Sequence, residues 1–166
     1  MLQNRDYTII FLRRRNLLQA SISGMIAHQT AVWQRRDLSC SLEELYANLQ
    51  PISIDEVREW IQGLHKNVIY YDRVISERPG GTCLKVVYED LYLVPQEQRE
   101  ANFERIFRFL DLEMRAIENG ELQQYLDPNN AQLNSAETYR FIPNVDEIEE
   151  KLGSDETGWL FPDRQG

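Results

Sequence analysis

Apolar residues along the chain follow two patterns: short continuous runs, and recurrences every three or four positions. The runs cover residues 8–13 and 83–88, and such runs are typical of buried strands in a parallel sheet. The recurrences predict helices, because they place the apolar side chains along one face. The expected helices cover residues 16–34, 41–46, 54–76, 96–111, 113–126 and 145–152.

The apolar faces of these helices predict core positions. For residues 16–34 the face comprises Leu18, Ile22, Met25, Ile26, Gln29 and Trp33. For residues 54–76 it comprises Val57, Trp60, Ile61, Leu64, Val68, Tyr71 and Ile75. For residues 96–111 it comprises Phe103, Ile106, Phe107 and Leu110.

Several residues carry the chemistry of helix ends. Asn16 and Asn144 stand where an N-cap would, and Gly153 follows the last predicted helix. Ser53 and Glu56 have the spacing of a capping box, in which each side chain bonds the other residue's backbone N–H.

The remaining C-terminal residues predict little regular structure. Residues 129–138 resemble a loop, and residues 154–166 form a polar tail. Its apolar part, Trp159-Leu160-Phe161, is expected to fold back onto the body of the protein.

The order of elements indicates an α/β fold that is mostly helical. Two strands separated by helical segments favour a parallel arrangement. Two strands are fewer than a sheet normally has, and the first begins close to Met1. We therefore expect residues 1–166 to form a single, N-terminally incomplete domain from a larger doubly wound sheet. An exposed sheet edge and marginal stability would follow.

Composition narrows the class of protein. A length of 166 residues with 42% hydrophobic residues suits one domain with its own core. No apolar run reaches the ~20 residues that cross a bilayer, and the N-terminal residues do not resemble a signal peptide. Cys40 and Cys83 stand alone, as do His28 and His65, so no metal site is expected. Isolated cysteines fit a reducing cytoplasmic setting.

Charge is distributed unevenly. The chain carries net charge −9, yet its first 36 residues hold six arginines and one acid, which is +5. Three of these arginines, Arg13, Arg14 and Arg15, stand consecutively between the first strand and the next helix. Guanidinium groups and a helix N-terminus both favour phosphate or sulfate. The pattern predicts a site for a small anion rather than for nucleic acid, which needs an extended basic surface. The alternative is that the arginines form salt bridges with the many acids.

Three segments together resemble the sulfotransferases, in particular the bacterial Stf0-like branch. The first runs from Ile10 through Arg13-Arg14-Arg15 and Ser23 to Trp33. The second is Val86-Val87-Tyr88-Glu89-Asp90-Leu91, followed by the helix that ends in Phe109-Leu110-Asp111-Leu112. The third is Ile142-Pro143-Asn144-Val145-Asp146-Glu147-Ile148 with Leu152. They occur in the family's order and cover most of the chain.

The resemblance implies a fold, a co-substrate and a site. The fold would be part of a three-layer parallel sheet like that of P-loop NTPases. The co-substrate would be 3′-phosphoadenosine 5′-phosphosulfate (PAPS), whose product is adenosine 3′,5′-bisphosphate. In the family, an Arg at a strand end and a Ser eight residues on bind the 3′-phosphate. Arg15 and Ser23 have this spacing, with Arg14 as an accessory residue, while Arg13 and Ser21 have the same spacing in a second register.

One part of the family pattern has no counterpart. The family holds the 5′-phosphosulfate in a Gly-rich loop after its first strand, and its catalytic carboxylate lies in the same region. Neither is found in this sequence, so the catalytic residues are unknown. We expect a sulfotransferase-family protein whose acceptor is a small molecule or carbohydrate hydroxyl or amine, with little transfer by the chain itself. A non-catalytic nucleotide-binding or protein-interaction module is the alternative, and a homo-oligomer is compatible with either.

Other candidates have ordinary structural interpretations. His28 could be a general base, but a packing role is favoured. Glu89 and Asp90 could bind a metal, but the interpretation that they fix the adjacent loop is favoured. Trp33, Trp60 and Trp159 are interpreted as core or interface anchors. The acids Asp146, Glu147, Glu149 and Glu150 are interpreted as a solvated helix face.

Overall fold

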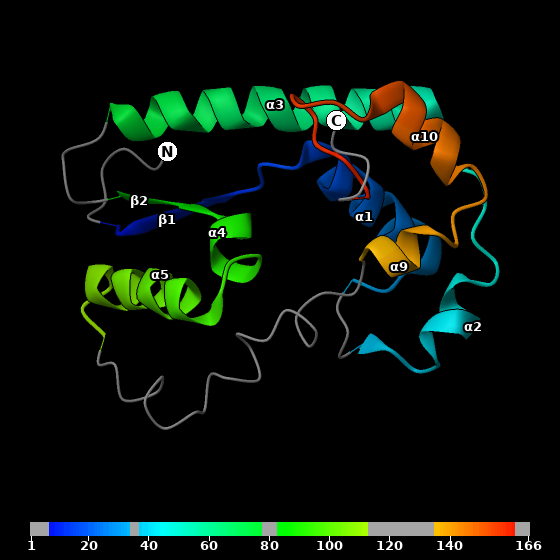
Figure 1. Cartoon of the computed structure of the whole chain (residues 1–166). Helices are drawn as coiled ribbons and strands as arrows, with labels where there is room; N and C mark the ends of the chain where they lie inside the picture. Colours follow the sequence, from blue (N-terminus) through cyan, green and yellow to red (C-terminus); the bar gives the residue numbers. More distant parts are fainter. Residues whose placement is uncertain (1–6, 34–36, 78–82, 113–134, 162–166) are drawn as a thin grey trace. The chain divides into compact units, whose positions relative to one another are not determined.

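The computed structural model describes residues 7–33, 37–77, 83–112 and 135–161, and the chain forms two compact units (Figure 1). The first unit consists of residues 1–15 and 67–128, and the second of residues 16–66 and 129–166. The predicted helix over residues 113–126 lies outside the described residues.

Two parallel strands form the sheet of the first unit. β1 (Ile9–Arg13) pairs with β2 (Cys83–Val87) from Ile9 opposite Cys83 to Arg13 opposite Val87. The predicted strands and their parallel pairing are confirmed. The described chain is therefore mixed α/β and mostly helical, as expected.

Helices lie on both sides of this strand pair within the first unit (Figure 1). The C-terminal part of α3 (Ile54–Ser76) contacts one face, where Tyr71 packs on Phe11. α5 (Gln96–Phe109) lies on the other side, and Arg105 donates a hydrogen bond to the Lys85 carbonyl at 3.0 Å. Between β2 and α5 stands the short helix α4 (Tyr88–Tyr92), which the apolar pattern did not predict.

The prediction that both strands are buried is wrong. In β1 the side chains of Ile10 and Leu12 are 38% and 52% exposed, and Val86 is the buried residue of β2. An apolar run shows which side chains favour burial. Burial of a strand on both faces also requires other elements that cover both faces of the sheet. The same holds for α5, in which Phe103, Ile106 and Phe107 are half-buried.

The second unit contains the main hydrophobic core. It comprises α1 (Leu17–Thr30), α2 (Leu42–Tyr46), the first part of α3, α9 (Ala136–Tyr139) and α10 (Val145–Leu152). Of the predicted face of α1, Leu18, Ile22, Met25 and Ile26 are buried as expected, whereas Gln29 and Trp33 are exposed. On α3, Val57 and Ile61 are buried, whereas Tyr71 is exposed. Gly24 of α1 lets the Trp60 ring approach closely, since a Cβ there would lie 2.5 Å from the ring.

Helix boundaries follow the predicted caps in most cases. Asn16 caps α1 by accepting from the Gln19 backbone N–H, and α3 has the predicted bounds, with the Glu56 N–H donating to Ser53. α1 ends at Thr30, earlier than predicted, because Ala31 adopts a left-handed backbone with φ 56°.

Two boundary predictions are wrong. Residues 136–139 form the helix α9 rather than a loop, because Ser135 and Thr138 make a capping box that the sequence reading missed. The Asn144 side chain does not cap α10, since it instead makes two hydrogen bonds with the Ile52 backbone, at 2.9 and 2.8 Å.

The C-terminal segment folds back as predicted, with Leu160 and Phe161 buried. It is held by Glu149, whose carboxylate accepts from the backbone N–H groups of Leu160 at 2.8 Å and Phe161 at 3.1 Å. Glu149 is 1% exposed, so its assignment to a solvated face is wrong. A buried carboxylate is stable only with such donors, and the apolar pattern does not reveal them.

Candidate functional site

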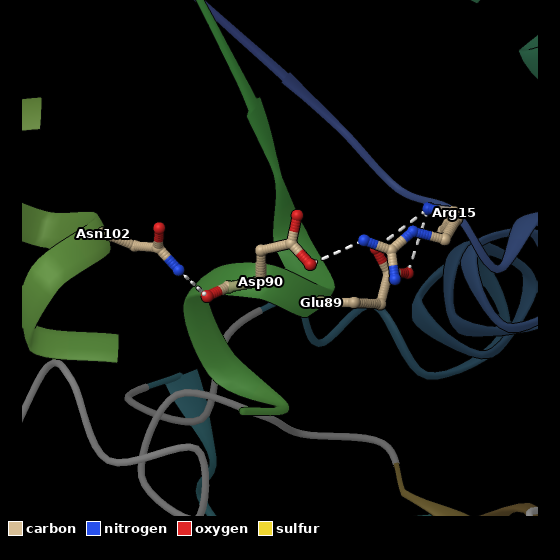
Figure 2. Close-up of polar contacts among 4 residues, drawn as sticks. All are labelled: Arg15, Glu89, Asp90 and Asn102. Carbon is tan, nitrogen blue, oxygen red and sulfur yellow. Dashed lines mark hydrogen bonds and ion pairs between the residues drawn. The ribbon is translucent and has the colours of Figure 1, made fainter. Parts of the chain in front are cut away.

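The backbone of the arginine turn in the first unit is fixed by Glu89, a residue of α4 just after β2. The backbone N–H of Arg15 donates to both carboxylate oxygens of Glu89, at 3.0 and 2.9 Å (Figure 2). Its guanidinium pairs with Asp90 at 2.5 Å. Hydrogen bonds from an N–H to a carboxylate are among the stronger ones in proteins. The interpretation that Glu89 and Asp90 fix the adjacent loop is therefore confirmed.

α4 places both carboxylates next to the turn. Because α4 begins directly after β2, Glu89 and Asp90 lie at the carboxyl end of that strand, beside the carboxyl end of β1. Asn102 of α5 donates from its side-chain amide to the Asp90 carbonyl at 2.7 Å (Figure 2). The turn, α4 and α5 are thus joined by a short series of hydrogen bonds.

Each arginine of the turn has a partner. Arg13 pairs with Asp72 at 3.5 Å, and Arg14 lies over the Tyr88 ring with its guanidinium carbon 3.9 Å from the ring centre. The salt-bridge alternative is thus observed for Arg13 and Arg15. These pairs are exposed, with 65% of the Arg15 side chain accessible. Exposed pairs contribute about 0.2–1 kcal/mol, so an anion of higher charge can compete with them.

The N-terminus of α1, in the second unit, offers less than the sequence predicted. The Leu18 N–H donates to the Thr157 carbonyl at 2.8 Å, and the Gln19 N–H donates to the Asn16 side chain at 2.9 Å. The Gln19 N–H is satisfied by the predicted N-cap, and the Leu18 N–H by a carbonyl from the C-terminal segment that the sequence did not predict. The attraction for an anion at the turn rests on side chains rather than on these N–H groups.

The two candidate serines differ in accessibility. Ser21 is fully buried, whereas Ser23 is half-buried and its hydroxyl lies 3.1 Å from the Tyr139 hydroxyl. Both serines belong to the second unit, and Arg14 and Arg15 belong to the first. Their joint contact with one phosphate stays a prediction, and burial favours the Ser23 register over the Ser21 register.

A hollow of about 220 Å³ lies in the first unit beside the turn. Its walls include Arg13, Lys85, Asp90, Asn102 and Arg105. The sequence reading missed the last two, because an Arg or Asn on an amphipathic helix has no distinguishing local signal. The apolar part of the lining is Val86, Val87, Leu91 and Ile106.

The remaining candidates acquire no catalytic geometry. The His28 ring lies edge-on to the rings of Trp33 and Trp60, at centroid distances of 5.0 and 5.7 Å. Both tryptophans are exposed, so they are not core residues. Among the described residues, no three His, Cys, Asp or Glu side chains gather as metal ligands. No described helix is both long enough and apolar enough to cross a membrane.

Tyr92 is the perturbed ionisable group near the turn. Burial raises its pKa above the usual value for tyrosine, and the neighbouring Tyr88 raises the pKa further. The Tyr92 ring packs against Tyr88, on which Arg14 lies.

Comparison of the chain with family models, with curated proteins and with solved structures finds no match.

Proposed function

We propose that this chain binds an adenosine nucleotide that carries a 3′-phosphate, of the kind represented by PAPS and adenosine 3′,5′-bisphosphate. The phosphate would be held by Arg15, with Arg14 as an accessory residue. The observation that carries the proposal is the fixed backbone of Arg15, which Glu89 holds with two hydrogen bonds while the guanidinium remains exposed.

Position supports the same proposal. In parallel α/β sheets, ligands bind beyond the carboxyl ends of the strands. Arg14 and Arg15 directly follow the carboxyl end of β1, and the adjacent β2 ends beside them. A guanidinium whose backbone is already fixed loses less entropy when it binds a phosphate, which increases affinity.

The family resemblance supplies the identity of the nucleotide. It assigns the 3′-phosphate to Arg15 and Ser23, and it implies sulfuryl transfer to a hydroxyl or amine acceptor. Ser23 remains in the proposal on that ground alone, and its half-buried hydroxyl is compatible with it.

For this chain by itself, we favour nucleotide binding without sulfuryl transfer. Sulfuryl transfer, like phosphoryl transfer, depends on groups that position and stabilise the transferred group. No segment of the sequence matches the family's loop for the 5′-phosphosulfate. With radiolabelled PAPS and a panel of hydroxyl and amine acceptors, we expect no transfer above background, and robust turnover would overturn this form of the proposal.

Calorimetry with adenosine 3′,5′-bisphosphate and with adenosine 5′-monophosphate tests the binding. The bisphosphate should bind at least tenfold more tightly, because only it carries the 3′-phosphate. Arg15→Ala should remove most of this preference, because a hydrogen bond to a charged group contributes about 1.5–3 kcal/mol and tenfold corresponds to about 1.4 kcal/mol. Ser23→Ala tests the second contact separately.

Arg73→Ala is the matched control. Arg73 is an exposed arginine of α3 that pairs with Glu77 just after the helix, so the substitution removes the same charge from the same unit. It should leave both affinities within twofold of wild type. Equal binding of the two nucleotides by the wild-type protein would refute the proposed function.

A further inference from the structure

We propose that the hollow of the first unit is a separate site for a tetrahedral oxyanion, such as phosphate, sulfate or a small monoester of either. Its central residue would be Arg105 of α5, with Lys85 and Arg13 as further cations. This inference stands apart from the nucleotide proposed above, which is assigned to Arg14 and Arg15.

The charge of the hollow is the first argument. Its lining contains three cations, Arg13, Lys85 and Arg105, and one carboxylate, Asp90. That carboxylate already pairs with Arg15, so it does not neutralise the three cations. In a chain with net charge −9, such a local excess of positive charge attracts small anions.

The pairing of these cations is the second argument. Arg13 and Lys85 share one carboxylate, Asp72, at 3.5 and 2.8 Å. Arg105 has no ion pair with a described residue, and it is held by a neutral acceptor, the Lys85 carbonyl. One hydrogen bond leaves most of the five guanidinium N–H donors available, and their planar arrangement suits an oxyanion.

The size and position of the hollow agree with such a ligand. A volume of about 220 Å³ accommodates a phosphate or sulfate with a few waters, or a small ester. Asn102, whose amide donates to the Asp90 carbonyl, lies in the same wall and presents its side-chain oxygen as an acceptor. An ester hydroxyl or a protonated oxyanion could donate to that oxygen, and the apolar part of the wall suits a short carbon chain.

Calorimetric titration of the protein with inorganic phosphate, at constant ionic strength, tests the site. We expect saturable binding that Arg105→Ala weakens at least tenfold and that Arg105→Lys restores in part. Sulfate and glycerol 3-phosphate form further arms, which distinguish a preference for the free ion from a preference for the ester.

Arg108→Ala is the matched control, because Arg108 is exposed on the same helix and pairs with Glu104 on the surface. It should leave phosphate affinity unchanged. Binding that Arg15→Ala abolishes and Arg105→Ala leaves intact would assign the anion to the turn and overturn the inference. An absence of saturable binding to the wild-type protein would overturn it as well.

The two proposals can fail independently. Arg105→Ala should leave the affinity for adenosine 3′,5′-bisphosphate within about twofold. Arg15→Ala frees the Asp90 carboxylate in the wall of the hollow, so it should weaken phosphate binding there, but by less than Arg105→Ala does. Circular dichroism of each variant excludes unfolding as the cause of a loss.

Discussion

At the scale of single residues, Asp90 pairs with the same Arg15 guanidinium to which we assign the phosphate. Its carboxylate lies 2.5 Å from the Arg15 guanidinium, so a phosphate bound by that guanidinium would compete with it. Asp90 is also fixed through its carbonyl by Asn102, so it remains beside the turn when its side chain is released. An internal carboxylate of this kind lowers the apparent affinity for any anion that needs the same donors.

Asp90→Asn should therefore tighten binding of adenosine 3′,5′-bisphosphate. The amide keeps the size of the side chain and removes its charge, and an exposed pair of this type contributes about 0.2–1 kcal/mol. We expect a two- to fivefold lower dissociation constant, measured by calorimetry at low salt, with a smaller effect at high salt because screening weakens the competing pair. Weaker binding would show that Asp90 assists the ligand rather than competing with it.

Glu89 has a different role from its neighbour, although the two are adjacent in sequence. Its carboxylate accepts from a backbone N–H, so it determines the shape of the turn rather than the charge of a side chain. The sequence predicted this use of the pair in general terms. The start of α4 determines which carboxylate accepts from the Arg15 backbone N–H and which from its guanidinium. The local sequence pattern does not specify where α4 starts.

At the scale of elements, the C-terminal segment is part of the structure of α1 in the second unit. The Thr157 carbonyl accepts from Leu18, and the Trp159 carbonyl accepts from the side chains of Asn16 and Gln19. Gly158 permits this approach, since its φ of 87° is in the left-handed region and a Cβ would lie 2.4 Å from the Asn16 side chain. The segment therefore provides hydrogen-bond partners that a helix N-terminus otherwise lacks.

Glu149→Ala should destabilise the protein through this segment. The substitution leaves the buried N–H groups of Leu160 and Phe161 without an acceptor, at a cost of about 2–3 kcal/mol. The expected fall in melting temperature is about 4–10 °C. Glu150→Ala on the exposed face of α10 is the control, and it should change stability by less than about 0.5 kcal/mol. Equal effects of the two substitutions would contradict this role of Glu149.

The elements that the sequence predicted well are those whose signals are local. The bounds of α3 and the positions of β1 and β2 follow from periodicity and from caps such as Ser53, which act over a few residues. α9, the burial of Glu149 and the partner of Asn144 were missed or misread. In the last two, side chains act on backbone groups distant in the sequence, and single-chain patterns contain no record of such contacts.

At the scale of the whole molecule, the two units differ in how much apolar surface they bury. Among the described residues, the second unit has a core of sixteen buried hydrophobic residues, whereas the strands of the first unit leave Ile10 and Leu12 exposed. Apolar side chains exposed on a sheet face, together with the outer edges of the two described strands, promote association with other chains. The prediction of a single domain stays a prediction, and it is the first unit that we expect to limit solubility.

Leu12→Lys should reduce self-association without loss of stability. The side chain is 52% exposed, so its replacement removes little buried apolar area, and a lysine at a strand edge discourages pairing. The apparent molecular mass from light scattering should rise with protein concentration at least twofold less steeply than for wild type. The melting temperature should stay within about 2 °C of wild type. Leu18→Lys, at a fully buried position of α1, should instead unfold the protein. An unchanged increase in scattering for Leu12→Lys would show that association uses another surface.

The hydrogen bonds from the Arg15 N–H to Glu89 have a consequence for the order of assembly. The two residues are 74 positions apart, so the turn cannot acquire its final shape until β2 and α4 have been synthesised. At a translation rate of about 5–20 residues per second, that interval is on the order of 4–15 s. Throughout it the arginines are present but not yet fixed in place. The selection of an anion by geometry that we propose, rather than by charge alone, thus becomes available only after Glu89 has been synthesised.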